Sequence, residues 1–118
     1  MLKNEFLEAV EDAVIDKAVV ARIEKTYGAI ESNEVRKILS LTSEPISVGD
    51  LRLLSTVEIA DFEDIANVDL ASKGLLPLFD AFDNDFVVYK LEEGSWSMFN
   101  IVDCIEFKEA GSLGDYLS

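Results

Sequence analysis

Apolar residues recur at helical spacing near the start of the chain. The intervals i, i+3, i+4, i+7 and i+8 place them on one face of a helix. This face is expected to carry Phe6, Ala9, Val10, Ala13 and Val14.

A second helical segment begins after Asp16, whose side chain can cap a helix start, and ends at Gly28. Its apolar face comprises Val19, Val20, Ile23 and Tyr27. The pattern leaves open whether these are one helix or two, because Asp16 and Lys17 could also lie on the exposed face of a long helix.

A third, short helix is predicted to begin at Ser32 or Asn33, with Glu34 in its first turn complementing the helix dipole. Its inward side chains are expected to be Val35, Ile38 and Leu39.

The middle of the chain is less regular. The segment Thr42–Asp50 contains Pro45 and Gly49 and is predicted to be a loop. A short strand is expected at Leu51, Leu53 and Leu54. One or two helical turns are then predicted over 56–66, with Ile59, Phe62 and Ile65 inward, and a loop over 67–74.

From Leu75 the pattern is typical of strands. The run 75–82 contains Pro77 and is predicted to be an edge or irregular strand, because proline cannot donate to the ladder. The segment Asp83-Asn84-Asp85 favours a turn, and so does 92–94.

The remaining strands follow these turns. The run 86–91 is rich in β-branched and aromatic residues, and 95–102 alternates, with Trp96, Met98 and Asn100 on one face and Phe99 and Ile101 on the other. A further short strand is expected at 104–108, and Ser112 is expected to cap a closing helical turn that carries Leu113, Tyr116 and Leu117.

The order of these elements predicts an α+β fold. N-terminal helices are expected to pack on an antiparallel β-meander with a short C-terminal helix, in a single domain spanning residues 1–118.

Charge is distributed unevenly along the chain. The net charge is −14; residues 1–52 carry seven basic and ten acidic residues, whereas residues 53–118 carry three and 14. Such a field repels phosphate backbones and attracts basic partners, so nucleic-acid binding is not expected and protein binding is. A role in solubility alone explains the same charge.

The sequence excludes several kinds of chemistry. It contains no histidine and one cysteine, which removes Ser-His-Asp and Cys-His arrangements and most zinc sites. Neither glycine-rich phosphate-binding motif occurs. Cys104 lies beside Asp103 and Glu106, which disfavour a thiolate, and it is predicted to fill space in the core. No catalytic residue, cofactor or metal is therefore predicted.

Candidate binding residues are mostly acidic. Asp80, Asp83 and Asp85 could hold a hard cation, but their spacing does not match a calcium loop and a polar turn is favoured. Trp96 is either an interface anchor or a core residue, with the core favoured. The candidate contact surface for a protein partner comprises Asp61, Glu63, Asp64, Asp80, Asp83, Asp85, Glu92, Glu93 and Trp96.

Several segments resemble the SUKH superfamily, which includes the yeast cell-wall-synthesis regulators and many bacterial immunity proteins. They are GDLRLLSTVEI (49–59), LLPLFDAFDNDFVVYKL (75–91), the tryptophan strand and SLGDYLS (112–118). Two departures concern loops, since Thr42–Gly49 carries only one glycine and Asp-Asn-Asp replaces a glycine-rich turn.

The resemblance implies that this chain is an immunity protein and not an enzyme. It implies a role in binding and neutralising a basic toxin, with a nuclease as one candidate toxin class. The alternative is a general interaction or regulatory module with another partner. We expect a cytoplasmic protein without a membrane segment, because the chain lacks a signal-peptide pattern and a run of about 20 apolar residues. We also expect a monomer or weak homodimer.

Overall fold

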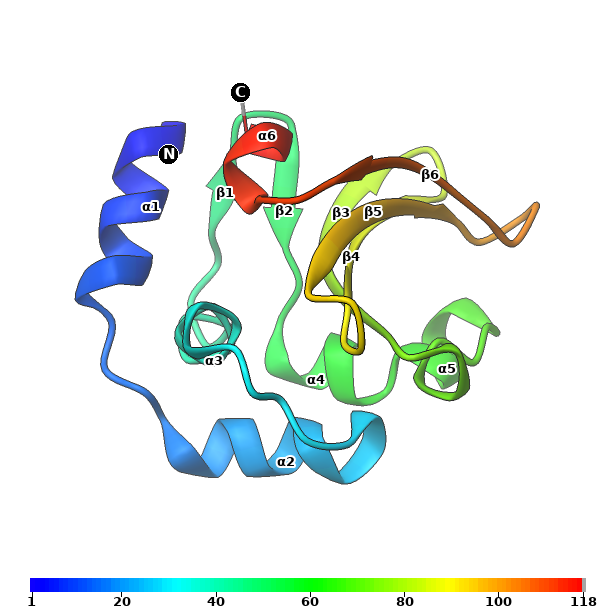
Figure 1. The fold of residues 1–118 in the computed structure, drawn as a ribbon, viewed down its shortest axis with the longest axis horizontal. Coiled ribbons are helices and arrows are strands. Elements are labelled where there is room, and N and C mark those ends of the chain that lie inside the picture. The colour runs from blue at the N-terminus through cyan, green and yellow to red at the C-terminus, as the bar shows by residue number, and fades with distance from the viewer. Residues whose placement is uncertain (118) are drawn as a thin grey trace.

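A computed structural model describes residues 1–117 and has the predicted α+β architecture, with an antiparallel sheet of strand order β1-β2-β3-β4-β5-β6 (Figure 1). The helices are α1 (Lys3–Asp12), α2 (Lys17–Tyr27), α3 (Asn33–Leu39), α4 (Thr56–Ala60), α5 (Phe62–Ala66), a 3₁₀ turn η1 (Ala71–Lys73) and α6 (Leu113–Leu117). The strands are β1 (Ser47–Val48), β2 (Leu51–Leu53), β3 (Leu75–Phe82), β4 (Asp85–Lys90), β5 (Ser95–Asn100) and β6 (Ile105–Ala110).

The first two helical segments are separate helices. Asp16 accepts hydrogen bonds from the N–H groups of Ala18 and Val19 at 3.1 and 3.3 Å, as an N-cap does. Its own N–H donates to Ser40 Oγ at 2.8 Å, which ties the break to the end of α3. The prediction that Val14 faces inward is wrong, because α1 ends at Asp12 and Val14 lies exposed in the connection.

Local capping chemistry fixes the ends of the next elements. Gly28 ends α2 with a φ of +90°, a region that glycine adopts readily. Ser32, and not Asn33, caps α3, because its hydroxyl accepts from the N–H of Val35 at 3.2 Å. Ser55 and Glu58 form a reciprocal capping box at the start of α4.

The sheet is covered on both faces. Phe6 of α1 packs edge-on against Phe79 of β3, with ring centroids 5.7 Å apart. Phe62 of α5 packs in the same way against Phe86 of β4, at 5.0 Å. Phe86 is paired with Asp80, the residue next to Phe79, so the two aromatic contacts lie on opposite faces. As a result Trp96 and the three residues after it are all buried, although their side chains alternate.

Three further predictions about local structure are wrong. The segment Thr42–Asp50 contains the short strand β1 and is not wholly a loop. Ile65 is exposed, because α5 starts anew at Phe62 instead of continuing the face of α4. Cys104 is exposed in the β5–β6 turn with a φ of +54°, so it does not fill the core.

The strand that contains Pro77 is irregular, as predicted, but it lies inside the sheet and not at its edge. Its register with β4 shifts between Pro77 and Phe79. The short strand β2 pairs only with Phe79 and Asp80, so Pro77 lies where β3 has a single strand neighbour. A missing N–H is tolerated at such a position.

The turn between β3 and β4 is confirmed. Asp83 and Asn84 both have positive φ values, 53° and 69°, as in the two-residue turns that suit the twist of a hairpin. At the end of the chain, α6 buries Leu113 and Tyr116 as predicted. Ser118, the last residue of the SLGDYLS segment, lies outside the described residues.

One ion-pair cluster joins β2, α4 and β3. Arg52 donates to both carboxylate oxygens of Glu58 at 2.9 and 3.0 Å and lies 3.4 Å from Asp80. The hydrogen bonds from Arg52 lower the pKa of Glu58 from 4.5 to about 2 against the opposing effect of burial, and the Ser55 N–H adds to this. A depressed carboxyl pKa stabilises the fold above pH 4.5, and the stabilisation is lost as the pH falls toward 2.

We predict that Glu58→Gln lowers the free energy of unfolding at pH 7 by about 1 to 2 kcal/mol, a range reduced because both side chains are about a third exposed. Glutamine retains the capping-box hydrogen bond, so the change reports mainly on the ion pair. Urea denaturation at pH 7 and pH 2.5 measures it, and the difference between variant and wild type should shrink at the lower pH.

The matched control is Glu44→Gln, at an exposed position in the loop after α3. It should change the free energy of unfolding at pH 7 by less than about 0.5 kcal/mol. A Glu58→Gln protein that loses as much stability on acidification as the wild type would contradict the assignment of this pH dependence to Glu58.

Candidate protein-binding surface

The acidic residues of the α4–α5 region surround a hollow. Asp61, Glu63 and Asp64 are exposed and line it together with Asp69, which follows α5. The hollow encloses about 110 Å³, and Tyr27 of α2 forms part of its wall. The structure therefore brings this predicted group together and adds a fourth carboxylate to it.

Tyr27 holds this region to the core. Its hydroxyl donates to the carbonyl oxygen of Ile59 at 2.7 Å, near the C-terminal end of α4, where helix carbonyls lack an intrahelical partner. Burial raises the pKa of Tyr27 well above its usual value, and the charges of Asp69 and Glu63 raise it further. The phenol therefore stays neutral and adds no negative charge to the acidic groups around it.

Glu93, at the β4–β5 turn, belongs to a second acidic group built on Lys90. The Nζ atom of Lys90 contacts Glu109 and lies 3.1 Å from Glu93 and 3.2 Å from Glu106. The hydrogen bonds that Lys90 donates to these carboxylates, Glu109 foremost and then Glu93, hold the pKa of Lys90 well above its usual value. Three carboxylates around one ammonium group leave an excess of negative charge.

The two groups are joined by further hollows in the surface. One of about 530 Å³ shares Tyr27 and Ala71 with the first hollow and is also lined by Glu31 and Glu92. Another, of about 340 Å³, shares Glu92 with it and reaches Lys90. Together they form a surface that we call the acidic band. It comprises Glu31, Asp61, Glu63, Asp64, Asp69, Glu92, Glu93, Glu106 and Glu109.

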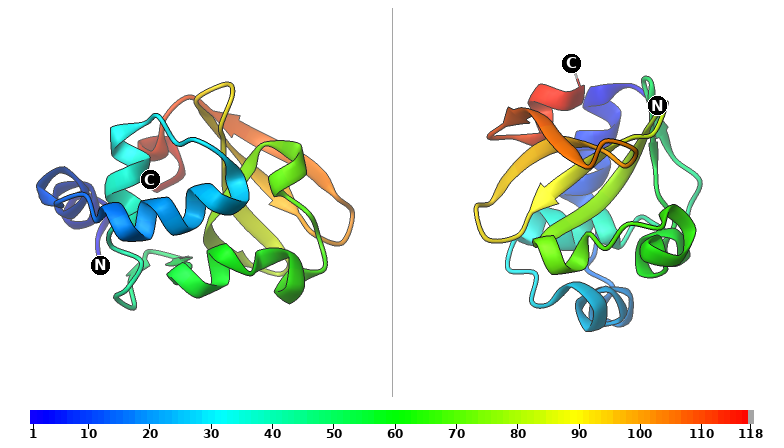
Figure 2. Two further views of the ribbon diagram at one scale, coloured as in Figure 1. Left: turned by 90° about the horizontal axis from the view of Figure 1, so that it is seen from below. Right: turned by 90° about the vertical axis from the view of Figure 1, so that its right-hand side faces the viewer.

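The acidic band runs from the helices α2, α4 and α5 to the strand β6, which lies in the upper part of Figure 1. Figure 1 places α5, the end of α2 and the turn after β4 in the lower part of the molecule. Seen from below, in the left view of Figure 2, α2, α4 and α5 lie toward the viewer. The band therefore combines residues from both halves of the chain.

The aspartates of the β3–β4 hairpin do not belong to this band. Asp80 pairs with Arg52 and accepts from the N–H of Phe82 at 2.7 Å. Asp85 accepts from the side-chain amide of Asn100 at 2.8 Å, and Asp83 is exposed in the turn. Within residues 1–117 no three acidic or cysteine side chains are arranged to hold a metal ion.

Trp96 is a core residue. Its exposed fraction is 2%, and its ring packs edge-on against Tyr89 with centroids 5.1 Å apart. This is the alternative that the sequence favoured. Trp96 is thus not available at the surface to contact a partner.

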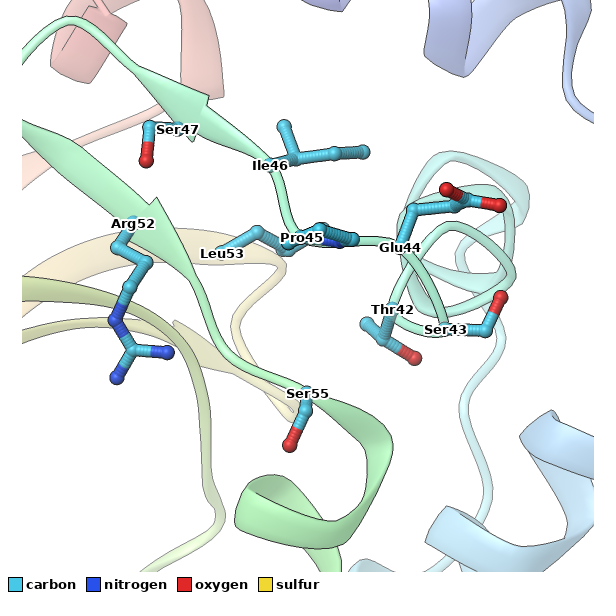
Figure 3. Close-up of a pocket in the computed structure, with 9 residues that line it drawn as sticks. All are labelled: Thr42, Ser43, Glu44, Pro45, Ile46, Ser47, Arg52, Leu53 and Ser55. Atoms are coloured by element: carbon cyan, nitrogen blue, oxygen red, sulfur yellow. The ribbon is translucent and has the colours of Figure 1, made fainter.

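Another hollow, of about 330 Å³, lies between β2 and the loop after α3 (Figure 3). Figure 3 shows the side chains of Ser43 and Glu44 pointing away from Arg52. In the same view Ser47 lies above the segment that contains Pro45 and Ile46, and Thr42 and Ser55 lie below it. The polar groups do not converge on a common point, and the charge of Arg52 is already matched by two carboxylates.

Four members of the acidic band were not predicted: Glu31, Asp69, Glu106 and Glu109. They come from segments that are distant in sequence, and only the folded chain brings them together. One signal was available for two of them. A lysine near the end of the apolar strand 86–91 favours carboxylates within reach. They come from β6, which is separated from β4 by β5.

Comparison of the chain with models of known protein families, with curated proteins and with solved structures finds no match. Of the helices in residues 1–117, none has the length and apolar character needed to span a bilayer.

We predict that Tyr27→Phe lowers the free energy of unfolding by about 1 to 2 kcal/mol, because the buried carbonyl of Ile59 loses its hydrogen bond. Chemical denaturation at pH 7 measures this change.

Tyr116→Phe is the matched control. Within residues 1–117 the Tyr116 hydroxyl is buried without a hydrogen-bond partner, so its removal should change stability little or raise it slightly. Equal losses in the two variants would contradict the role given to the Tyr27 hydroxyl.

Proposed function

We propose that this chain is an immunity protein that binds a basic toxin domain through the acidic band and so neutralises it. The observation that carries the proposal is the band itself, where nine carboxylates gather around adjoining hollows. Two lysines, Lys73 and Lys90, lie among them.

Within residues 1–117, the positive charge beside the band does not match its nine carboxylates. Lys90 alone serves three of them. A basic partner would supply the missing positive charge. Complementary fields also steer two proteins together and speed their association, which suits a protein that must capture a toxin before it acts.

The toxin class is supported by the resemblance of 49–59, 75–91 and 112–118 to SUKH immunity proteins. A toxin that acts on nucleic acid needs a basic substrate surface. An acidic band can cover such a surface in place of the phosphate backbone, which gives a physical mechanism of neutralisation.

We predict that removing three charges of the band slows binding. The variant Asp61→Asn/Glu63→Gln/Asp64→Asn should associate about tenfold more slowly with the basic toxin domain encoded beside this chain's gene at low salt, with a smaller change in dissociation. The difference should shrink in about 0.5 M salt, where the Debye length is a few ångströms. Stopped-flow or surface-binding kinetics measure both rates.

The control variant, Glu8→Gln/Glu11→Gln/Asp12→Asn, removes the same number of charges from exposed positions on α1. Its association rate should stay within about twofold of wild type, because these charges lie away from the band. Equal slowing in both variants would assign the effect to net charge and not to the band.

A cellular assay tests the function itself. Cells that express the neighbouring toxin domain should survive when this chain is co-expressed and die when it is not. Absence of both binding and rescue would overturn the proposal. Tight binding to a neighbouring protein that is not toxic would indicate the general interaction module instead.

A further inference from the structure

The two edges of the sheet differ. At one edge, β1 has two residues, and the N–H of Gly49 beside it donates to the carbonyl of Met1 at 3.3 Å. At the other edge, β6 has six residues, and within residues 1–117 no strand pairs with its outer side. Figure 1 shows the turn before β6 extending away from the helices, whereas the end of β6 leads into α6. Only β6 therefore offers a long edge for pairing.

The hydrogen bonds of the neighbouring strands show which backbone groups face outward. The N–H of Ile101 donates to the carbonyl of Asn84 at 3.0 Å, so the Asp85–Asn100 pair between them is a non-hydrogen-bonded pair. The backbone groups of Asn100 therefore point toward β6.

Asn100 lies opposite Ile105, so the N–H and C=O groups of Ile105 point inward to β5. The direction of the backbone N–H and C=O groups alternates along a strand. The N–H and C=O groups of Glu106 therefore point outward, away from the sheet. This residue has the unpaired donor and acceptor that an added strand requires.

The side chains along this edge are suited to contact. Ile105 and Phe107 point to one face of the sheet and are 53% and 39% exposed, and Val102 in the adjoining turn is 68% exposed. Glu106 points to the other face, where it contacts Lys90 and belongs to the acidic band. The edge is therefore continuous with the surface proposed to bind the partner.

Natural edge strands usually carry a lysine or a bulge that blocks further pairing. In β6 both occur only in the second half. Lys108 has a φ of +53°, lies beside a register shift, and sits 5.7 Å from the ring of Tyr116 in α6. The first half, 105–107, has neither device and remains open.

We propose, on the basis of the function proposed above, that 105–107 of β6 pairs with a β-strand of the basic partner whose residues alternate between apolar and basic. Its apolar side chains would lie beside Ile105 and Phe107, and a basic one beside Glu106. A second copy of this chain is a poorer occupant, because two chains of net charge −14 repel each other.

The test uses two short peptides of identical composition, both with chemically capped termini. One alternates valine and lysine, and the other has the lysines in one block. Titration followed by NMR should show tighter binding of the alternating peptide to the wild-type chain and slower hydrogen exchange at the Glu106 N–H. Equal binding of the two peptides, or unchanged exchange at Glu106, would overturn the inference.

Two variants separate backbone pairing from charge. Glu106→Pro removes the outward N–H. It should weaken binding of the alternating peptide about tenfold, to the affinity of the peptide that has its lysines in one block. Glu106→Gln keeps the N–H and should preserve the preference between peptides. A preference that survives in Glu106→Pro, or self-association of the wild type that this variant abolishes, would overturn the assignment.

The two proposals fail in different ways. Toxin binding and rescue without a peptide preference would leave the immunity function in place and refute the edge. A peptide preference without toxin binding would retain the edge as a site for basic strands and refute the toxin partner.

Discussion

Burial of both faces of the central strands is the constraint on which the rest of this structure depends. The contact of Phe6 with Phe79 closes one face of the sheet, and the contact of Phe62 with Phe86 closes the other. Helices that precede β1 in the chain and helices that follow β2 are therefore both needed to cover a single sheet. The apolar residues of the helices are largely used in this way, and the charged residues are left at the margins where the elements meet.

The same arrangement explains why so much negative charge remains at the surface. The region after residue 52 has three basic residues, and two of them are already engaged. Lys90 is held by three carboxylates, and Lys108 lies over the ring of Tyr116. Little positive charge is left to offset the carboxylates of α5, the β4–β5 turn and β6. The acidic band therefore depends on how these elements meet and not only on the composition of the chain.

Features that depend on neighbouring residues were predictable from the sequence. The cap at Asp16, the helix end at Gly28 and the turn at Asp83-Asn84 all follow from the local chemistry of those side chains. Features that depend on strand order were not. Pro77 predicted an edge strand, but β2 pairs with only part of β3 and lets the strand lie inside the sheet.

The same distinction applies to the candidate surface. Asp61, Glu63 and Asp64 are close in sequence and were recognised as a group, whereas Glu31 and Glu106 join them only through the topology of the sheet and helices. No local pattern specifies such a meeting, because it depends on which strands become neighbours.

The shortness of β1 has a consequence for assembly. A sheet that can accept a strand at both edges can stack copy after copy into an open fibre. Here β1 spans two residues, and the N–H of Gly49 beside it donates a hydrogen bond to Met1. Further strands can therefore be added to the sheet at β6 and not at β1. A partner strand added there would become the new edge strand of the sheet. This chain would then end the assembly and would not connect two partners.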